Sequence, residues 1–377
     1  MPKNIVICCD GTGNEFGDEN SNVVKLYSTL VINSEQVGYY HPGVGTMGSP
    51  AAMGRMERTW SRLKGLAFGS GLLDNVADAY RYLMDIYADG DGIYLFGFSR
   101  GSYTARVLGG VLSMFGLLCP GNEGHIPYVM RMYAARRRQT GRGKASMDVD
   151  EEFKYIFSRD VTLHFVGVWD TVSSVGWIYD PVKLPFTGNN PIIKTGRQAI
   201  STHERRCFYL PMLWGTPEGD QDIKQVWFSG VHSDVGGSYP EMESHLSKLS
   251  LAWMLQEAIA AGLRVKEEKA LCVLGTGERL ARFLPNYVPP DPNGTIHPSL
   301  KRAWWLLELL PHKYEEYPGT GSRVRWRIPL GAYRQIPEGA VIYEPALPRI
   351  DAKQLPKTYV LEPSVRFGSR QAMPARA

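Results

Sequence analysis

Short apolar runs alternate with amphipathic stretches along the chain up to about residue 263. The apolar runs are rich in aliphatic and aromatic residues and have the length of buried strands. Several stretches between them carry apolar residues at helical spacing. This alternation predicts an α/β fold in which helices cover both faces of a mainly parallel central sheet. The predicted strands are 4–10, 37–46, 91–99, 161–170 and 223–237, and the predicted helices include 21–31, 72–89 and 246–263.

The alternation ends near residue 263, where the composition of the chain changes. Prolines become frequent between residues 285 and 292, and tryptophans cluster beyond them. We therefore predict a core domain over residues 1–263 and a helical C-terminal elaboration over 264–363, which could serve as a lid or dock. Residues 364–377 are expected to form a flexible tail.

One serine stands where a predicted strand meets a predicted helix. Ser99 is framed by Gly97 and Gly101 in the order G-x-S-x-G, with no residues left over for a loop. So sharp a turn strains the backbone of the serine, and glycines on either side remove side chains that would clash. This pattern predicts a nucleophile elbow, with Ser99 as the nucleophile. The alternative is a small residue in an ordinary turn.

A serine hydroxyl is a poor nucleophile unless a base takes its proton, and the base needs a partner that fixes its tautomer. In hydrolases with such an elbow, the acid and the histidine follow the serine along the chain, at strand ends. Asp170 ends the apolar run 161–170 and His232 ends the next one, so we predict Ser99, Asp170 and His232 as a catalytic triad.

Two aspartates leave alternatives open for the acid. Asp170 is also well placed to cap a helix. Asp234 stands two residues after His232 and could orient the ring of that histidine or cap the glycine turn that follows. Among the other histidines, we expect His203 to be exposed in a polar helical stretch and His164 to be a core histidine with its hydrogen bonds satisfied.

The oxyanion of an acyl-transfer reaction needs hydrogen-bond donors. The backbone N–H of Arg100, directly after the serine, is the expected first donor. We expect the second donor from the loop "DGTGN", in which Gly11 and Thr12 are candidates. Asp10 and Asn14 can support this loop through side-chain hydrogen bonds. An ordinary strand-to-helix turn is the alternative.

Composition excludes several classes of function. The chain is 44% hydrophobic and 21% charged with a formal net charge of +4, which is ordinary for a globular protein and too mild to indicate a nucleic-acid partner. No apolar run is long enough to span a membrane, and the N-terminus lacks the features of a signal peptide. We expect a protein that is cytoplasmic as made, with any export by a non-classical route. The ligand spacing singles out no metal site, and we expect no cofactor.

Five cysteines are present, and none forms a C-x-x-C motif. Cys8 and Cys9 are adjacent in a predicted strand, so they should point to opposite faces of the sheet and cannot easily bridge. All five cysteines are therefore expected to be reduced thiols, most of them buried.

A series of motifs, taken together and in order, resembles a known family. The family is an α/β-hydrolase family, long catalogued as of unknown function, that includes the first class of type VI secretion lipase effectors. The resemblance covers residues 3–345 and implies a serine esterase or phospholipase with Ser99, Asp170 and His232 in its triad motifs. It further implies a lipid or small-ester substrate and, for an effector, a secretion or immunity partner. The motifs are "DGTGN", "YYHPGVGT", "DNVADAYRYL", "GFSRGSYTAR", "VGVWDTV", "ERR", "WFSGVHSDVGG" and "IPEGAVIYEPAL".

Two other classes of function compete with this one. The stretch "CDGTGN" is similar to the start of haloacid-dehalogenase phosphatases, which would make the protein a phosphate-ester hydrolase, although Cys8 occupies the position of their nucleophilic aspartate. A non-catalytic binding or scaffold module on the same fold is the other alternative.

Two segments could contact a membrane surface. Residues 303–314, "AWWLLELLPHKY", hold Trp304, Trp305 and several leucines beside basic residues, as a helix at a lipid interface would. The same residues would suit a helix packed over the core. The basic stretch between Arg131 and Lys144 could meet anionic headgroups or form a solvated helix end.

Overall fold

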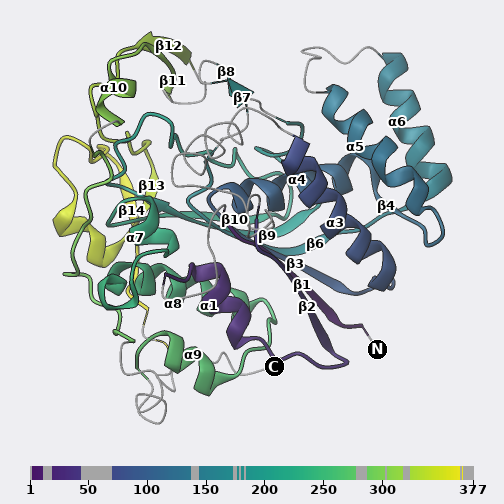
Figure 1. The fold of residues 1–377 in the computed structure, drawn as a ribbon, viewed down its shortest axis with the longest axis horizontal. Coiled ribbons are helices and arrows are strands. Elements are labelled where there is room, and N and C mark those ends of the chain that lie inside the picture. The colour runs from purple at the N-terminus through teal and green to yellow at the C-terminus, as the bar shows by residue number, and fades with distance from the viewer. Residues whose placement is uncertain are drawn as a thin grey trace, which may run out of the picture.

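An eight-stranded sheet forms the centre of the molecule in the computed structural model (Figure 1). The structure describes residues 2–11, 19–43, 70–136, 144–172, 176–177, 180–181, 184–276, 287–301, 304–316, 323–365 and 367. All seven strand pairings in the sheet are parallel. The strand order is β14-β13-β10-β9-β6-β3-β1-β2. The strands are β1 (Asn4–Cys9), β2 (Gln36–His41), β3 (Gly92–Phe98), β6 (Leu163–Trp169), β9 (Ile193–Ser201), β10 (Asp222–Phe228), β13 (Ala340–Tyr343) and β14 (Tyr359–Glu362).

Helices cover both faces of the sheet, as the alternation of the sequence predicts (Figure 1). The α/β-hydrolase-like fold class is therefore confirmed. One face carries α3 (Ser70–Ile86), α4 (Arg100–Phe115), α5 (Ile126–Ala135) and α6 (Lys144–Phe157), and the other carries α1 (Asn22–Thr29), α8 (His245–Ala260) and α9 (Glu267–Val273). Short elements complete the description: β4 (Leu117–Leu118), β5 (Ser158–Arg159), β7 (Gly176–Trp177), β8 (Asp180–Pro181), α7 (His232–Gly236), α10 (Trp304–Glu308), β11 (His312–Glu316), β12 (Arg323–Arg327) and the 3-10 turns at 123–125, 241–243 and 344–349.

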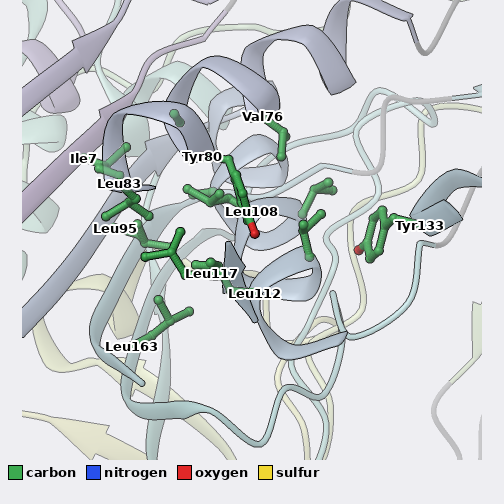
Figure 2. Close-up of a cluster of buried hydrophobic side chains, with 14 of the residues drawn as sticks. Ile7, Val76, Tyr80, Leu83, Leu95, Leu108, Leu112, Leu117, Tyr133 and Leu163 are labelled. Atoms are coloured by element: carbon green, nitrogen blue, oxygen red, sulfur yellow. The ribbon is translucent and has the colours of Figure 1, made fainter. Parts of the chain in front are cut away.

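Alternate side chains of β1 belong to two separate cores. In β1, Ile5 and Ile7 pack with α3 and α4, whereas Val6 and Cys8 pack with α1 and α8. Figure 2 shows the first of these clusters, in which Tyr80 and Leu83 of α3 lie near the strand leucines. Cys8 and Cys9 lie on opposite faces as expected, and all five cysteines are free thiols.

The direction of the chain reverses between β1 and β3. From β1 the chain moves outward to β2, then returns past β1 to β3 and continues to the opposite edge. The connections that leave β1 and β3 therefore run to opposite faces, so a topological switch point lies between these two strands. Ser99 follows β3 and Asp10 follows β1. Both predicted site segments thus meet at the position where open α/β sheets bind ligands.

Strand β9 lies at the middle of the sheet but was not among the predicted strands. Its sequence, "IKTGRQAIS", places Arg197 and Gln198 inside a buried strand. Each polar group has a partner: Arg197 pairs with Asp222 and Glu257, and Gln198 accepts a hydrogen bond from Arg106. These partners, which lie far away in the sequence, satisfy the hydrogen bonds of the buried polar groups. The same polar residues interrupt the apolar pattern by which a buried strand is recognised in a sequence.

The C-terminal segment contributes to the same sheet as the core. Strands β13 and β14 extend the sheet beyond β10, so the sheet crosses the boundary predicted at residue 263. The expected helical character of residues 264–363 is found only in part, because the described portion holds the short helices α9 and α10 besides four strands. Most of the predicted tail lies outside the described residues. In the part of the chain that the structure describes, no helix combines the length and apolarity needed to cross a membrane.

Gly101 provides a test of how tightly the elbow is packed against the sheet. A Cβ atom at Gly101 would lie 2.1 Å from the carbonyl oxygen of Cys9, a backbone atom that cannot rotate away. Gly101→Ala should therefore lower the free energy of unfolding by about 1–3 kcal/mol or more, measured by urea denaturation. Gly124→Ala is the matched control, since its Cβ would meet nothing within 4 Å. Equal stability of the two variants would contradict this packing.

Candidate active site

The turn at Ser99 has the strained geometry of a nucleophile elbow. Ser99 lies between the last residue of β3 and the first residue of α4, with φ 57° and ψ −120°. A Cβ at Gly97 would lie 2.5 Å from the carbonyl oxygen of Gly101, so both glycines are required by the close approach of helix and strand. Such backbone strain persists only where the surroundings determine it, and it presents the hydroxyl at the strand end.

Ser99, His232 and Asp170 form a continuous hydrogen-bonded relay. Ser99 Oγ lies 2.8 Å from His232 Nε2, and His232 Nδ1 lies 2.6 Å from Asp170 Oδ2. Because a carboxylate can only accept, Nδ1 carries the proton and Nε2 is left to accept the hydrogen bond of the serine. The structure therefore brings together the three residues that the sequence analysis selected, in the arrangement a general base needs.

Three neighbouring residues hold the histidine in place. His232 is the first residue of α7, directly after the strand β10 and a short turn. Its ring lies between Phe98 and Tyr209, at centroid distances of 4.7 and 4.8 Å. Its backbone N–H donates to Glu204 over 3.2 Å. The Arg206 guanidinium outweighs the effect of burial on Glu204 and holds the pKa of this carboxyl at about 2. Glu204 is thus a fixed anion that anchors the start of α7.

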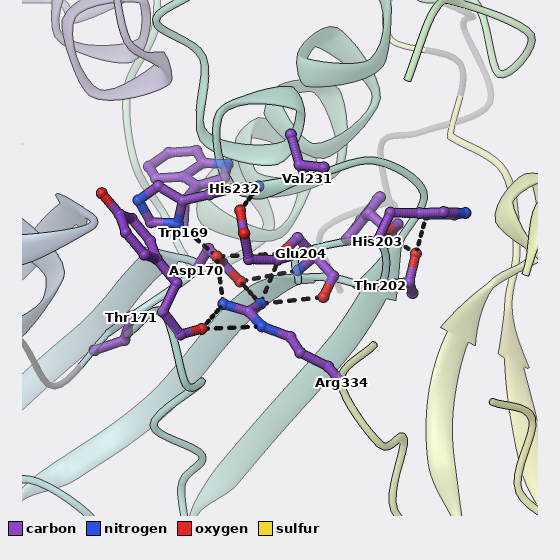
Figure 3. Close-up of polar contacts among 12 residues, drawn as sticks. Trp169, Asp170, Thr171, Thr202, His203, Glu204, Val231, His232 and Arg334 are labelled. Carbon is purple, nitrogen blue, oxygen red and sulfur yellow. Dashed lines mark hydrogen bonds and ion pairs between the residues drawn. The ribbon is translucent and has the colours of Figure 1, made fainter. Parts of the chain in front are cut away.

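Asp170 is a fully buried anion with partners on both oxygens (Figure 3). The Ser201 N–H and Arg334 Nη1 lie 2.9 and 2.6 Å from Oδ1. Ser201 Oγ and Arg334 Nη2 lie 3.2 and 3.1 Å from Oδ2, which also accepts from His232. Burial alone would raise the pKa of Asp170, but the charge of Arg334 and the hydrogen bond of His232 hold it well below its ordinary value. The carboxylate is therefore ionised at every pH at which the protein would work.

Burial has the opposite effect on the base. Loss of solvent lowers the pKa of His232, and the hydrogen bond and charge of Asp170 offset only part of this effect. A neutral imidazole at neutral pH is the form that can accept a proton from Ser99.

The rival acid, Asp234, contacts other groups. Its carboxylate accepts from the Val231 N–H at 2.9 Å and lies 2.6 Å from Nδ1 of His297. It therefore caps the helix that begins at His232 and ties a distant loop to it. Asp170, and not Asp234, contacts the ring of His232.

The sequence also predicts the surroundings of two histidines outside the relay. His203 was expected to be exposed in a helix, and this was wrong. It is half-buried outside any helix, where Nδ1 and Nε2 lie near Thr202 and the Arg349 carbonyl oxygen. His164 lies in β6 with Nε2 2.8 Å from the carbonyl oxygen of Ala261, so it is satisfied as expected.

The predicted oxyanion loop is described only at its first residues. Arg100 is the first residue of α4, in the position expected for one donor. Gly11 donates its N–H to the Asp10 carboxylate at 2.6 Å. Asp10 also accepts from Ser21 Oγ at 2.7 Å and from the Tyr40 hydroxyl at 2.8 Å, so it supports the loop as expected. Thr12 and Asn14 lie outside the described residues.

Sequence reasoning missed Glu204, Tyr209 and Arg334 in this site. Glu204 belongs to the motif "ERR", which the resemblance included without a role for it. Tyr209 and Arg334 stand in stretches without strand or helix periodicity, and no local signal marks them. Among the residues with described positions, no group of three or more potential ligands could hold a metal ion.

A comparison with models of protein families shows which family the chain belongs to. Residues 3–257 match the model of the type VI secretion system phospholipase effector Tle1-like catalytic domain. The chain belongs to this family. The match supports the resemblance that the motifs carried, and it includes Ser99, Asp170 and His232 but ends before Arg334.

Several individual proteins are also similar to this chain. An uncharacterized protein of Saccharomyces cerevisiae is 38% identical over 233 residues, which cover 56% of this chain and 34% of the relative. The chain thus spans about a third of the length of that relative. An uncharacterized Pseudomonas aeruginosa structure is 18% identical with a TM-score of 0.41, covering 71% of this chain and 47% of the other. A Tle1 effector bound to the VgrG spike is 18% identical with a TM-score of 0.36, covering 65% and 53%.

The two candidate acids can be separated by substitution. Asp170→Asn removes the anion that Arg334 and His232 share and leaves a buried guanidinium without its partner, so the free energy of unfolding should fall by about 3–5 kcal/mol. Turnover of a soluble ester by the protein that remains folded should fall on the order of ten-thousandfold. Asp234→Asn is the control and should lose far less activity. Near-full turnover by Asp170→Asn, with loss in Asp234→Asn, would transfer the acid role to Asp234.

Proposed function

We propose that this protein is a serine hydrolase that cleaves carboxylic esters of lipids, as a lipase or phospholipase. The observation that carries the proposal is the relay from Ser99 through His232 to Asp170, with distances of 2.8 and 2.6 Å. Membership of a phospholipase effector family supports the lipid substrate.

The reaction follows from the positions of three side chains. Ser99 Oγ attacks the ester carbonyl while its proton passes to His232 Nε2. The resulting imidazolium is stabilised by the Asp170 carboxylate, which stays ionised. Collapse of the tetrahedral intermediate expels the alcohol, which takes the proton from His232 and leaves an acyl group on Ser99. Water, activated by the same histidine, then releases the fatty acid.

The described contacts weigh against phosphate chemistry at the DGTGN loop. A side chain that takes part in phosphoryl transfer, as nucleophile or as acid and base, needs an atom that faces the substrate. The Asp10 carboxylate is 1% exposed and accepts hydrogen bonds from Gly11, Ser21 and Tyr40. The thiol of Cys8, at the position of the phosphatase nucleophile, is fully buried and burial raises its pKa. The scaffold alternative is tested by the labelling experiment below.

Several apolar side chains of α10 and of the segments that follow it are exposed to solvent. We define the ridge as Trp305, Leu306, Leu309, Leu310, Ile328 and Leu330. Leu306 and Leu309 are 69% and 57% exposed, whereas the acidic Glu308 points inward and accepts from Cys207 and Gly331. Of the two alternatives for residues 303–314, a helix packed over the core was wrong for these leucines. An inverted pattern of this kind, apolar outside and acidic inside, is typical of a surface that meets an apolar partner.

Aromatic contacts connect this ridge with the active site. Trp304 of α10 lies 5.9 Å from the ring of Tyr209, which in turn lies 4.8 Å from His232. A lipid layer bound at the ridge would thus lie beside the ester-cleaving groups. We propose that the ridge makes a peripheral contact with a membrane. In the basic stretch, Arg136 is paired with Asp150, and residues 137–143 lie outside the described residues.

Partners and location are proposed on family membership alone. We propose that the chain is made in the cytoplasm and that a secretion component or an immunity protein binds it, as the effector family suggests. No further partner follows from the described residues.

Covalent labelling tests the nucleophile directly. A fluorophosphonate probe should modify the protein at Ser99, and Ser99→Ala should lose hydrolysis of nitrophenyl esters and defined phospholipids on the order of a thousandfold or more. Ser102→Ala is the matched control, since its hydroxyl bonds only to the Gly97 and Trp169 carbonyl oxygens. A folded protein that reacts with neither probe nor ester would support the scaffold alternative.

Substitutions on the ridge test the membrane contact. Leu306→Gln with Leu309→Gln should spare the hydrolysis of a short soluble ester, because neither side chain reaches the relay. The double variant should bind phospholipid vesicles less and lose most of its activity on them. Ile156→Gln, at a residue 58% exposed on α6, is the control for removal of a surface apolar group. An equal loss on soluble and vesicle substrates would place these leucines in the core structure instead.

A further inference from the structure

Arg334 reaches the candidate active site from a distant part of the chain. It lies between β12 and β13, beyond residues 3–257 of the matched catalytic domain. Its side chain is only 4% exposed, and both terminal nitrogens bond to the Asp170 carboxylate. Figure 3 shows the guanidinium among the residues that surround this carboxylate. A buried cation therefore enters the relay from outside the matched domain.

The guanidinium is held from several directions. Nη1 donates to the carbonyl oxygen and the hydroxyl of Ser201 at 3.1 and 2.6 Å. Nε donates to the Tyr209 carbonyl oxygen at 3.1 Å, and Nη2 bonds to the same oxygen. The Arg334 carbonyl oxygen accepts from Gln354, which also bonds to the Thr202 carbonyl oxygen. The planar fork is thus fixed in the position where it meets both carboxylate oxygens.

We propose that Arg334 is a positioning residue of the catalytic relay, which holds the plane of the Asp170 carboxylate so that Oδ2 meets His232. The inference rests on the proposed serine-hydrolase function. Arg334 donates to both oxygens of Asp170, including the Oδ2 that meets His232, so rotation of the carboxylate would break two charged hydrogen bonds. A relay built only from the matched domain would leave this buried carboxylate without a cation.

The charge of Arg334 also affects the base. The charged groups that face His232 among the described residues are Asp170, Glu204 and Arg206. Arg334 stands behind Asp170 and offsets part of the negative charge that would stabilise the imidazolium. Removal of this positive charge should therefore raise the pKa of His232. At low pH, His232 would then be protonated in a larger fraction of the molecules. Protonated histidine cannot accept the serine proton, so activity would be lost at a higher pH than in the wild type.

A purely structural tie is the competing explanation, and Arg349 offers the matched control. Arg349 lies in the same C-terminal segment and donates to the carbonyl oxygens of Pro292 and Gly294, away from the relay. Arg349→Gln loosens this segment without removing a contact of Asp170. The experiment compares Arg334→Gln, Arg334→Lys and Arg349→Gln in the full chain, with thermal unfolding as the check on folding.

The readouts are kcat/KM for a soluble ester and the rate of fluorophosphonate labelling, each as a function of pH. Arg334→Gln should lose on the order of tenfold to a hundredfold in both rates. The acid limb of its pH–rate profile, where the rate falls at low pH, should move up by about one pH unit. Arg334→Lys keeps the charge but not the fork, so it should lose rate while its acid limb stays near that of the wild type. Arg349→Gln should match the wild type in both.

Each contrary result has a distinct meaning. An acid limb that does not move in Arg334→Gln, with a rate loss equal to that of Arg349→Gln, would reduce Arg334 to a structural tie. If Arg334→Gln does not fold, Arg334→Lys decides, and a wild-type rate in that variant would overturn the positioning role. Failure of the wild-type protein to react with the probe would instead refute the proposed function on which the inference rests.

Discussion

Asp170 is a buried anion at the end of β6, and the groups around it determine the geometry of the whole site. Water cannot stabilise this charge, so the protein surrounds it with the Ser201 backbone, His232 and Arg334. These partners come from three separate parts of the chain, and each is fixed by the same carboxylate. The orientation of His232 toward Ser99 is therefore a consequence of how the fold compensates one buried charge.

The parallel sheet makes this convergence possible. Carboxyl ends of neighbouring parallel strands meet at one edge, so residues that follow β3, β6 and β10 lie close together although they are far apart in sequence. Close packing at Gly97 and Gly101 brings the elbow helix onto the end of β1. Ser99 and Asp170 both have positive φ, and this backbone strain accompanies the placement of two side chains at one edge of the sheet.

The sequence predicted the parts of the site that obey local rules. Ser99, Asp170 and His232 each stand where an apolar run stops, and strand ends of this kind face a common edge. Arg334 could not be found in this way, because its position depends on a fold-back of the C-terminal segment that has no local periodicity. Strand β9 was missed for a related reason. Its Arg197 and Gln198 look like surface residues until their partners on other elements are known.

If Ser99 is the nucleophile, catalysis passes through an acyl group on its hydroxyl oxygen. Acid quenching of the protein during turnover of a nitrophenyl ester, followed by mass spectrometry of its peptides, tests this directly. We expect an acyl adduct on the peptide that contains Ser99, formed together with a burst of nitrophenol and absent from Ser99→Ala. An adduct on another residue, or hydrolysis that continues undiminished in Ser99→Ala, would contradict it.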